Sequence, residues 1–175
     1  NLATSSDATF TTAAAVPVAG CINSAAAWQN APVAAQTGNL TVEYDAVPGA
    51  ANMDGVSGLS NGAAAAYTSL AAAVRFNNAG MIDARNAGAY GAAAAIPYIA
   101  GLTYHFRLVV NIPARSYSAY VRQGAGAEQL IGANYAFRTE QASVPALNNL
   151  GLFASSASEQ VCGVAVTASG PAPDT

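Results

Sequence analysis

"TYHFRLVVNIPARSYSAYV", residues 103–121, alternates apolar and polar side chains over two runs that flank a turn. The apolar side of the first run holds Tyr104, Phe106, Leu108 and Val110. Because successive side chains of a strand point to opposite faces, this alternation predicts a strand with one buried face. Pro113 has a fixed φ that suits a turn between the runs. The stretch therefore predicts a β-hairpin whose outer row includes His105, Arg107 and Asn111.

The same alternation recurs along much of the chain. Residues 39–47, "NLTVEYDAV", place Leu40, Val42, Tyr44 and Ala46 on one side. Shorter strands are expected at residues 55–60, 72–76, 81–85, 129–132, 134–138, 150–155 and 160–168. Many short strands separated by Gly, Asn and Pro predict an all-β fold, an antiparallel two-sheet β-sandwich.

Residues 62–76 are rich in alanine, and helix propensity alone would favour a helix there. Propensity is a weak guide beside the strand pattern around it. We expect a loop with about one helical turn, followed by a strand from about Ala71.

The chain of 175 residues is long enough for one domain with its own core. We expect an N-terminal arm at 1–27, a sandwich domain at 28–168 and a C-terminal tail at 169–175. The chain starts at Asn1 without an initiator methionine or a signal-like segment, which suggests a mature or trimmed product.

Charge is scarce in this sequence. Only 9% of residues are charged, the six basic residues are all arginine, and the net charge is −3. Nucleic acid is therefore not expected as a partner, because phosphate binding needs clustered cations. The longest uncharged apolar run, residues 87–102, contains Pro97 and is too short for a bilayer span, so no membrane span is expected.

Two cysteines, Cys21 and Cys162, lie near opposite ends of the chain. If oxidised, they would join the two ends of a compact fold by a disulfide. Two buried free thiols are the alternative. A disulfide, together with low charge and abundant Ser, Thr, Asn and Gly, would suit a secreted, extracellular protein.

Glu43 and Asp45 are the candidate catalytic pair. They lie two residues apart on one strand, so their carboxylates share a face at a spacing that hydrolysis can use. Val47 occupies the next position on that face, where a third acid would extend the pattern. A solvated or salt-bridged strand face is the alternative, and His105 is the only histidine.

A calcium site is the only cofactor site that the sequence suggests. Asp45, Asn52 and Asp54 offer the hard oxygen ligands that calcium prefers. No spaced loop motif supports this set, and a turn stabilised by Asx-type hydrogen bonds is the alternative.

The sequence also resembles a known fold family. The residues concerned are "WQNAPVAAQTGNLTVEYDAVPGAANMDGVSGLSNG", "VRFNNAGMIDARNAGAY", "YHFRLVVNIPARSYSAYV" and "IGANYAFRTEQASVPALNNLGLF". Together they resemble a concanavalin A-like, laminin-G-like jelly-roll domain of secreted bacterial proteins, over roughly residues 28–166. The resemblance implies two curved sheets, with sugar bound on the concave face or at loop tips beside calcium.

Carbohydrate binding needs aromatic faces next to polar side chains. We select His105, Arg107, Tyr120 and Tyr90 as candidate sugar contacts, with an ordinary polar strand surface as the alternative. Trp28 is expected to pack against the first core strand. A secreted, non-catalytic lectin-like module that binds a polysaccharide, glycan or other extracellular surface is our first hypothesis.

Two other functions stay open. The chain could be a structural subunit of an extracellular filament, sheath or surface layer, with copies of itself as partners, since small apolar residues and edge strands favour close packing. A polysaccharide hydrolase or lyase that uses Glu43 and Asp45 is the third hypothesis.

Overall fold

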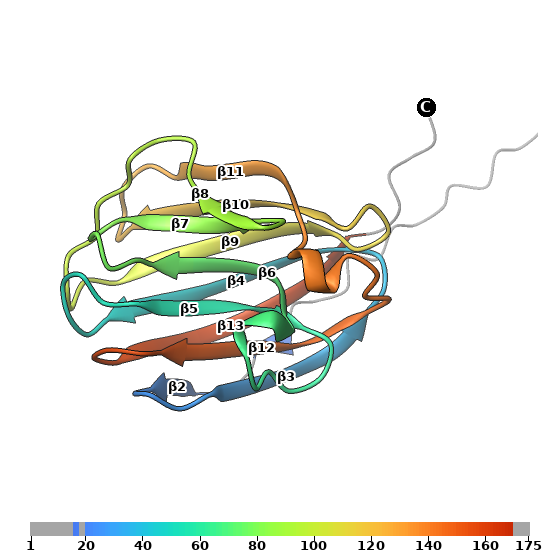
Figure 1. The fold of residues 1–175 in the computed structure, drawn as a ribbon, viewed down its shortest axis with the longest axis horizontal. Helices are drawn as coiled ribbons and strands as arrows, with labels where there is room; N and C mark the ends of the chain where they lie inside the picture. Colours follow the sequence, from blue (N-terminus) through green and yellow to red (C-terminus); the bar gives the residue numbers. More distant parts are fainter. Residues whose placement is uncertain (1–15, 18–19, 170–175) are drawn as a thin grey trace, which may run out of the picture.

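The computed structural model describes residues 16–17 and 20–169, and its fold is a sandwich of two antiparallel sheets (Figure 1). The seven-stranded sheet consists of β1 (Val16–Pro17), β13 (Glu159–Ser169), β4 (Asn39–Pro48), β9 (Tyr104–Asn111), β10 (Ser116–Gln123) and β11 (Gln129–Ala136) in that order, with β2 (Cys21–Ser24) also paired to β13. The six-stranded sheet has the order β3 (Gln29–Gln36), β12 (Leu147–Ala154), β5 (Gly55–Ser60), β6 (Leu70–Phe76), β7 (Ile82–Asn86) and β8 (Ala89–Gly91). The all-β, two-sheet prediction is confirmed, and the fold is the concanavalin A-like jelly roll that the sequence resembles.

The two helices of the described residues are single 3-10 turns, η1 (Tyr67–Ser69) and η2 (Thr139–Gln141). Neither could span a bilayer. The expectation for residues 62–76 is also confirmed, because a loop and η1 lead directly into β6 at Leu70.

The hairpin at 103–121 forms as predicted, from β9 and β10. Its register sets Leu108 opposite Ala119 and Phe106 opposite Val121, and all four side chains are buried. At the turn, Asn111 accepts a hydrogen bond from the backbone N–H of Ala114. Asn111 therefore stabilises the turn through its side chain.

An aromatic cluster joins the two sheets at the centre of the core. Tyr44 of β4 stacks on Phe106 of β9 with ring centroids 5.6 Å apart. Phe76 of β6, in the opposite sheet, meets Phe106 edge to face, also at 5.6 Å. Contacts of this kind add to the free energy gained by burying the rings. The alternating residues of the hairpin and of β4 thus supply one wall of the core, and β6 supplies the other.

Some strands differ from their predictions. The two strands expected at 129–132 and 134–138 are one strand, β11, whose pairing with β10 shifts register around Ala119. The break expected near Ala133 is an irregularity within the strand, with Asn134 at a φ of 52°. Strands β3 and β8 were not predicted, because neither shows regular alternation.

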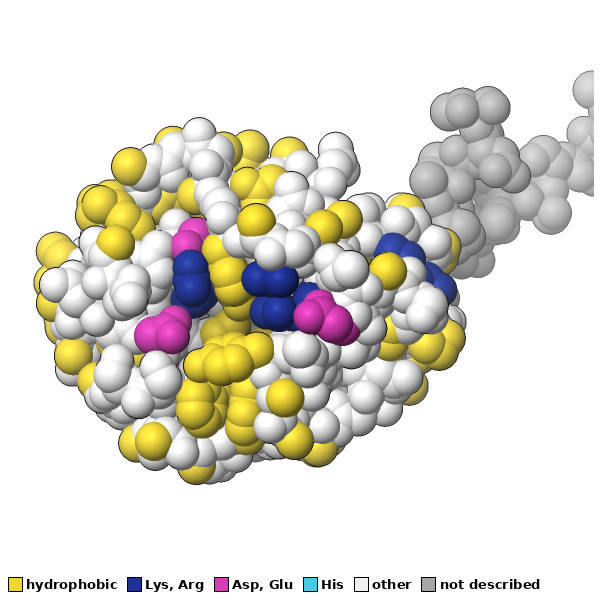
Figure 2. All heavy atoms as spheres, in the orientation of Figure 1, with side chains coloured by type: hydrophobic (Ala, Val, Ile, Leu, Met, Phe, Trp, Pro, Cys, Tyr) yellow, Lys and Arg dark blue, Asp and Glu magenta, His cyan; other side chains and the backbone are white. Residues whose placement is uncertain are grey.

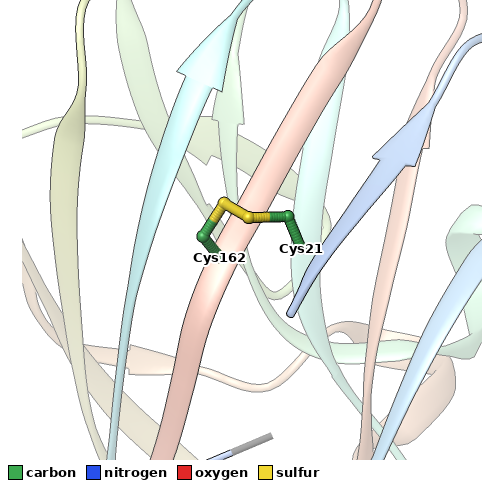
Figure 3. Close-up of a disulfide and its surroundings, with 2 residues drawn as sticks. All are labelled: Cys21 and Cys162. Carbon is green, nitrogen blue, oxygen red and sulfur yellow. A yellow bond between two sulfur atoms is a disulfide. The ribbon is translucent and has the colours of Figure 1, made fainter. Parts of the chain in front are cut away.

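The predicted disulfide is confirmed. Cys21 and Cys162 form a disulfide between β2 and β13, at positions that face each other in the strand register (Figure 3). Part of the segment predicted as an arm therefore pairs with the sandwich through β2. Residues 1–15 and 170–175 lie outside the described residues, and the division into arm, domain and tail stays a prediction.

Candidate functional site

The predicted polar row lies on the outer face of the seven-stranded sheet. The register of β4 and β9 sets Asp45 opposite His105 and Glu43 opposite Arg107. His105 Nδ1 lies 2.8 Å from an Asp45 carboxylate oxygen, and its Nε2 lies 3.4 Å from a Glu43 oxygen. Both ring nitrogens of His105 are therefore occupied by carboxylates of the neighbouring strand.

Arg107 is similarly engaged within the protein. Its guanidinium donates two hydrogen bonds to Glu128, one of them from Nε at 2.8 Å, and lies 4.1 Å from the ring centroid of Tyr120. These hydrogen bonds lower the pKa of Glu128 and raise the pKa of Arg107. Three of the four predicted sugar contacts, His105, Arg107 and Tyr120, thus lie together, but their strongest donors already have partners.

The fourth predicted sugar contact, Tyr90, lies on the outer face of the other sheet.

The predicted calcium ligands are likewise separated. Asp45 faces outward from β4, whereas Asp54 precedes β5 and contacts Arg75 of the six-stranded sheet. Among the described residues, no three His, Cys, Asp or Glu side chains are grouped to hold a metal. The turn at Asn52, where φ is 54°, does not bring Asp45 to Asp54, so calcium at this set stays a prediction that the geometry does not favour.

A hollow of about 230 Å³ opens on the outer face of the six-stranded sheet. It is lined by Asp54, Tyr67, Arg75, Arg85, Tyr90 and Arg138. Figure 2 shows the arginine side chains gathered around it near the middle of this face, with hydrophobic side chains beside them. Strands β6, β7 and β8 supply Arg75, Arg85 and Tyr90 because every second residue of a strand points outward. Residues from three adjacent strands, two loops and η1 thus meet at one place.

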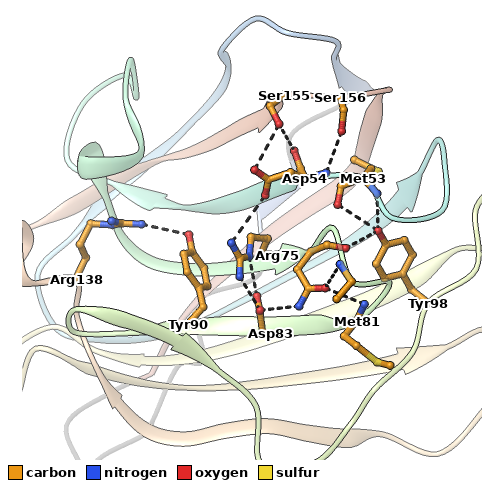
Figure 4. A network of polar contacts seen from close by, with 12 residues as sticks. Met53, Asp54, Arg75, Met81, Asp83, Tyr90, Tyr98, Arg138, Ser155 and Ser156 are labelled. Carbon is orange, nitrogen blue, oxygen red and sulfur yellow. Dashed lines mark hydrogen bonds and ion pairs between the residues drawn. The ribbon is translucent and has the colours of Figure 1, made fainter.

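An ion pair fixes one wall of this hollow. Arg75 donates to both oxygens of Asp83, at 3.0 and 2.8 Å, and lies 3.9 Å from Asp54 (Figure 4). Burial by itself would lower the pKa of Arg75, but Asp83 outweighs it and the pKa is raised. Asp83 pairs with Arg75 and not with Arg85 of its own strand, because β6 and β7 set Arg75 directly opposite Asp83.

Tyr90 is surrounded by guanidinium groups. The central guanidinium carbons of Arg75, Arg85 and Arg138 lie 3.8, 5.2 and 5.9 Å from its ring centroid. Cations attract the face of an aromatic ring, so the ring helps to hold this group together. Burial raises the pKa of Tyr90, and the three arginines offset part of that effect. The Tyr90 hydroxyl therefore stays protonated and can both donate and accept a hydrogen bond.

An aromatic ridge borders the hollow. Trp28 stacks on Phe153 with centroids 5.1 Å apart, and Tyr67 meets both rings edge to face. Tyr67 is 37% exposed. Trp28 was expected against the first core strand, but it packs on the outside of β12 because it directly precedes β3, which borders β12. The loop before η1 packs directly on Gly151, because a Cβ at this position would lie only 2.5 Å from the Ala64 methyl group.

The arginines of the hollow were not selected from the sequence. Arg75 and Arg85 each lie at an outward position of a strand. The neighbouring strand in each case also carries a polar or aromatic residue at an outward position. This pairing of outward residues is the feature of the sequence that could have indicated them. Arg138 carries no such signal, because it follows the end of β11 and reaches the hollow only through the fold.

These features belong to a sandwich of the kind found in lectins and in domains of glycan-acting enzymes. A sialidase superposes with a TM-score of 0.57 at 13% identity, covering 79% of this chain and 14% of that one. The catalytic domain of a GH131 β-glucanase from Podospora anserina has a TM-score of 0.52 at 10% identity, over 78% of this chain and 60% of that one. Basic winged bean lectin with Tn-antigen has a TM-score of 0.50 at 10% identity, over 82% and 78%. At such identities the likeness shows the fold alone.

At the level of sequence, no protein-family description matches the chain. A gellan lyase of a Bacillus species is 36% identical to it over 113 residues, which is 63% of this chain and 4% of the lyase. The chain thus spans a small fraction of that relative.

Proposed function

We propose that this chain is a secreted, non-catalytic module that binds polysaccharide through the hollow beside Tyr90. The observation that supports it is the meeting of an exposed Tyr67, Tyr90 and three arginines in one hollow on the outside of a sheet. Sugar rings pack their apolar faces on aromatic side chains, and their hydroxyls need nearby polar partners. The hollow offers both within a single surface.

The relatives are consistent with this proposal. By its name, the gellan lyase acts on a polysaccharide, and this chain resembles a small part of it. A module of this size would hold a larger enzyme on its polymer. The disulfide favours an oxidising, extracellular setting.

Replacing Tyr67 tests the proposed surface. We expect Tyr67→Ala to weaken polysaccharide binding about tenfold, because truncating an exposed aromatic anchor removes a large contact area. Affinity electrophoresis in gels containing gellan, xylan or β-glucan identifies a polymer that the wild type binds. Isothermal titration calorimetry with soluble fragments of that polymer then gives the affinities.

Tyr120→Ala is the matched control, because it removes the same side chain, which lies beside Arg107 on the opposite face of the sandwich. It should leave the affinity unchanged. Equal losses in both variants would place binding elsewhere, and no retardation of the wild type on any polymer would overturn the proposal.

A second candidate function is catalysis on the seven-stranded sheet. The observation that favours it is that His105 contacts both Asp45 and Glu43, beside a hollow lined by Asp45, Thr103, His105, Arg122 and Gly124. Histidine and carboxylate side chains are common general acids and bases in enzymes. This candidate ranks second because β4 places no third acid in line.

Glu43→Gln and Asp45→Asn test the catalytic candidate. If these carboxylates act on a glycosidic bond, the release of new chain ends from polysaccharide falls at least about a hundredfold in either variant. Reducing-end and unsaturated-product assays detect hydrolysis and elimination respectively. Product release by the wild type that persists in both variants would exclude this pair.

The alternative that copies of the chain build a filament, sheath or surface layer stays a prediction. A hollowed, charged outer face suits close packing between copies less well than a flat apolar one, because interface cores are depleted of charge.

A further inference from the structure

The charges around the hollow are not balanced. Three guanidinium groups face two carboxylates, and both carboxylates, Asp54 and Asp83, are directed at Arg75. Within residues 20–169, neither Arg85 nor Arg138 has an acidic side chain within ion-pair distance. Arg85 donates from Nε to the carbonyl of Ala87 and is one of the residues that line the hollow. The hollow therefore carries a net positive charge.

Arg138 is the less usual of these two arginines. It is only 4% exposed, its Nη2 donates to the Tyr90 hydroxyl at 3.2 Å, and its buried Nε has no hydrogen-bond partner within the described residues. Burying a cation without a counter-charge is costly, so such groups are normally paired. A bound anion would supply the missing partner.

We propose that the hollow binds a carboxylate-bearing sugar unit of an acidic polysaccharide, with Arg138 and Arg85 as donors to the carboxylate. The inference rests on the proposed function and specifies its ligand. A guanidinium presents planar, paired N–H donors that fit a carboxylate, and these charge-assisted hydrogen bonds are stronger than neutral ones. The Tyr90 ring lies close to both arginines, and its hydroxyl can bond to a ring oxygen or hydroxyl of the same unit.

The dimensions of the hollow suit one unit of a longer chain. Its volume of about 230 Å³ lies below the roughly 300–1,000 Å³ of pockets that enclose drug-sized ligands. Tyr67 lines the same hollow and continues into the aromatic ridge with Trp28 and Phe153. The next sugar units can therefore lie along this ridge, outside the charged part of the hollow.

Matched polymers test the carboxylate requirement. Sodium polygalacturonate, the same polymer with its carboxyl groups reduced to alcohols, and dextran sulfate are compared by affinity electrophoresis and calorimetry. We expect polygalacturonate to bind at least about tenfold more tightly than its reduced form, with affinity falling as salt is raised. Dextran sulfate should bind more weakly than polygalacturonate, because its anions are not held in the geometry of a uronate.

Two substitutions assign the effect to the arginines. Arg85→Gln, at a partly exposed position, and Arg138→Gln should each reduce polygalacturonate affinity about tenfold. Arg115→Gln is the control, since Arg115 also donates to a backbone carbonyl but lies in the turn between β9 and β10, outside the hollow. Thermal unfolding shows whether each variant is folded, and Arg85→Gln keeps the test valid if Arg138→Gln is not.

The outcomes separate this inference from the proposed function. Equal affinity for polygalacturonate and its reduced form, or tighter binding of dextran sulfate, overturns the carboxylate assignment but leaves polysaccharide binding intact. Failure to bind any polymer overturns both. Unchanged affinity in a folded Arg85→Gln and a folded Arg138→Gln overturns the assignment to this hollow.

Discussion

The wild-type protein should become less stable as pH rises from 5 to 8, and Glu159→Gln should abolish this pH dependence. Glu159 opens β13 with its side chain in the core, where it is 0% exposed. Within the described residues, neither of its carboxyl oxygens has a hydrogen-bond partner at normal distance. A charged carboxylate is therefore strongly disfavoured at this position.

The surroundings of Glu159 explain both its burial and its protonation. A Cβ at position 55 would lie 2.4 Å from a Glu159 oxygen, so Gly55 leaves the space that the carboxyl fills. Burial raises the pKa of Glu159 to about 8, and the nearby Ser57 hydroxyl offsets only part of this effect. Ser57 bonds mainly to the hydroxyl of Tyr44, at 2.9 Å. The folded protein thus holds a protonated glutamic acid at neutral pH.

The sign of the pH effect follows from this pKa. An unfolded chain releases the Glu159 proton near pH 4.5, whereas the folded protein retains it up to about pH 8. Between these values the folded state binds more protons, so the free energy of unfolding decreases as pH rises, by about 1.4 kcal/mol for each pH unit. The total reaches at most about 5 kcal/mol. The stabilisation that comes from retaining the Glu159 proton is fully present below pH 4.5 and is lost above pH 8.

Urea unfolding at a series of pH values measures the effect. The difference in unfolding free energy between Glu159→Gln and the wild type should increase with pH, because glutamine cannot ionise. Glu140→Gln, at an exposed position of η2, is the control and should follow the wild-type curve. A constant difference between Glu159→Gln and the wild type from pH 5 to pH 8 would show that Glu159 ionises normally in the folded protein.

The fold could be predicted from the sequence where one face of a strand is buried and the other is solvated. β4 and the β9–β10 hairpin show regular alternation, because their inner side chains meet the core and their outer ones meet water. β5 is buried on both faces and shows no alternation, so only its glycines and the neighbouring turns indicated a strand there. β8 has three residues, too few for any period.

The candidate site was harder to predict, because its residues come from separate parts of the chain. The sequence selected Tyr90 together with His105, Arg107 and Tyr120, but the fold places Tyr90 on the other sheet. Alternation in the sequence shows that a side chain points away from the core, but it does not show which of the two sheets carries that side chain. Glu159 was also missed, since a lone carboxyl at the start of a strand gives no sign in the sequence of its burial.

The disulfide is expected to add several kcal/mol to the free energy of unfolding. Cys21 and Cys162 are 141 residues apart, so the bond closes a loop that includes nearly the whole sandwich. Closing so long a loop restricts the unfolded chain, and the expected stabilisation is about 2–5 kcal/mol. Locally, the bond also fastens β2, a strand of four residues, to the edge of β13.

Replacing both cysteines should therefore lower stability while leaving the hollow beside Tyr90 intact. In Cys21→Ser/Cys162→Ser we expect the free energy of unfolding to fall by about 2–5 kcal/mol in denaturant titrations. The wild type in reducing buffer should behave in the same way, which separates loss of the bond from effects of the serines. Polysaccharide affinity should not change, because β13 keeps its ladder with β4 and the six-stranded sheet lies in the other layer. A loss below about 1 kcal/mol would mean that the unfolded chain is already as restricted without the bond as with it.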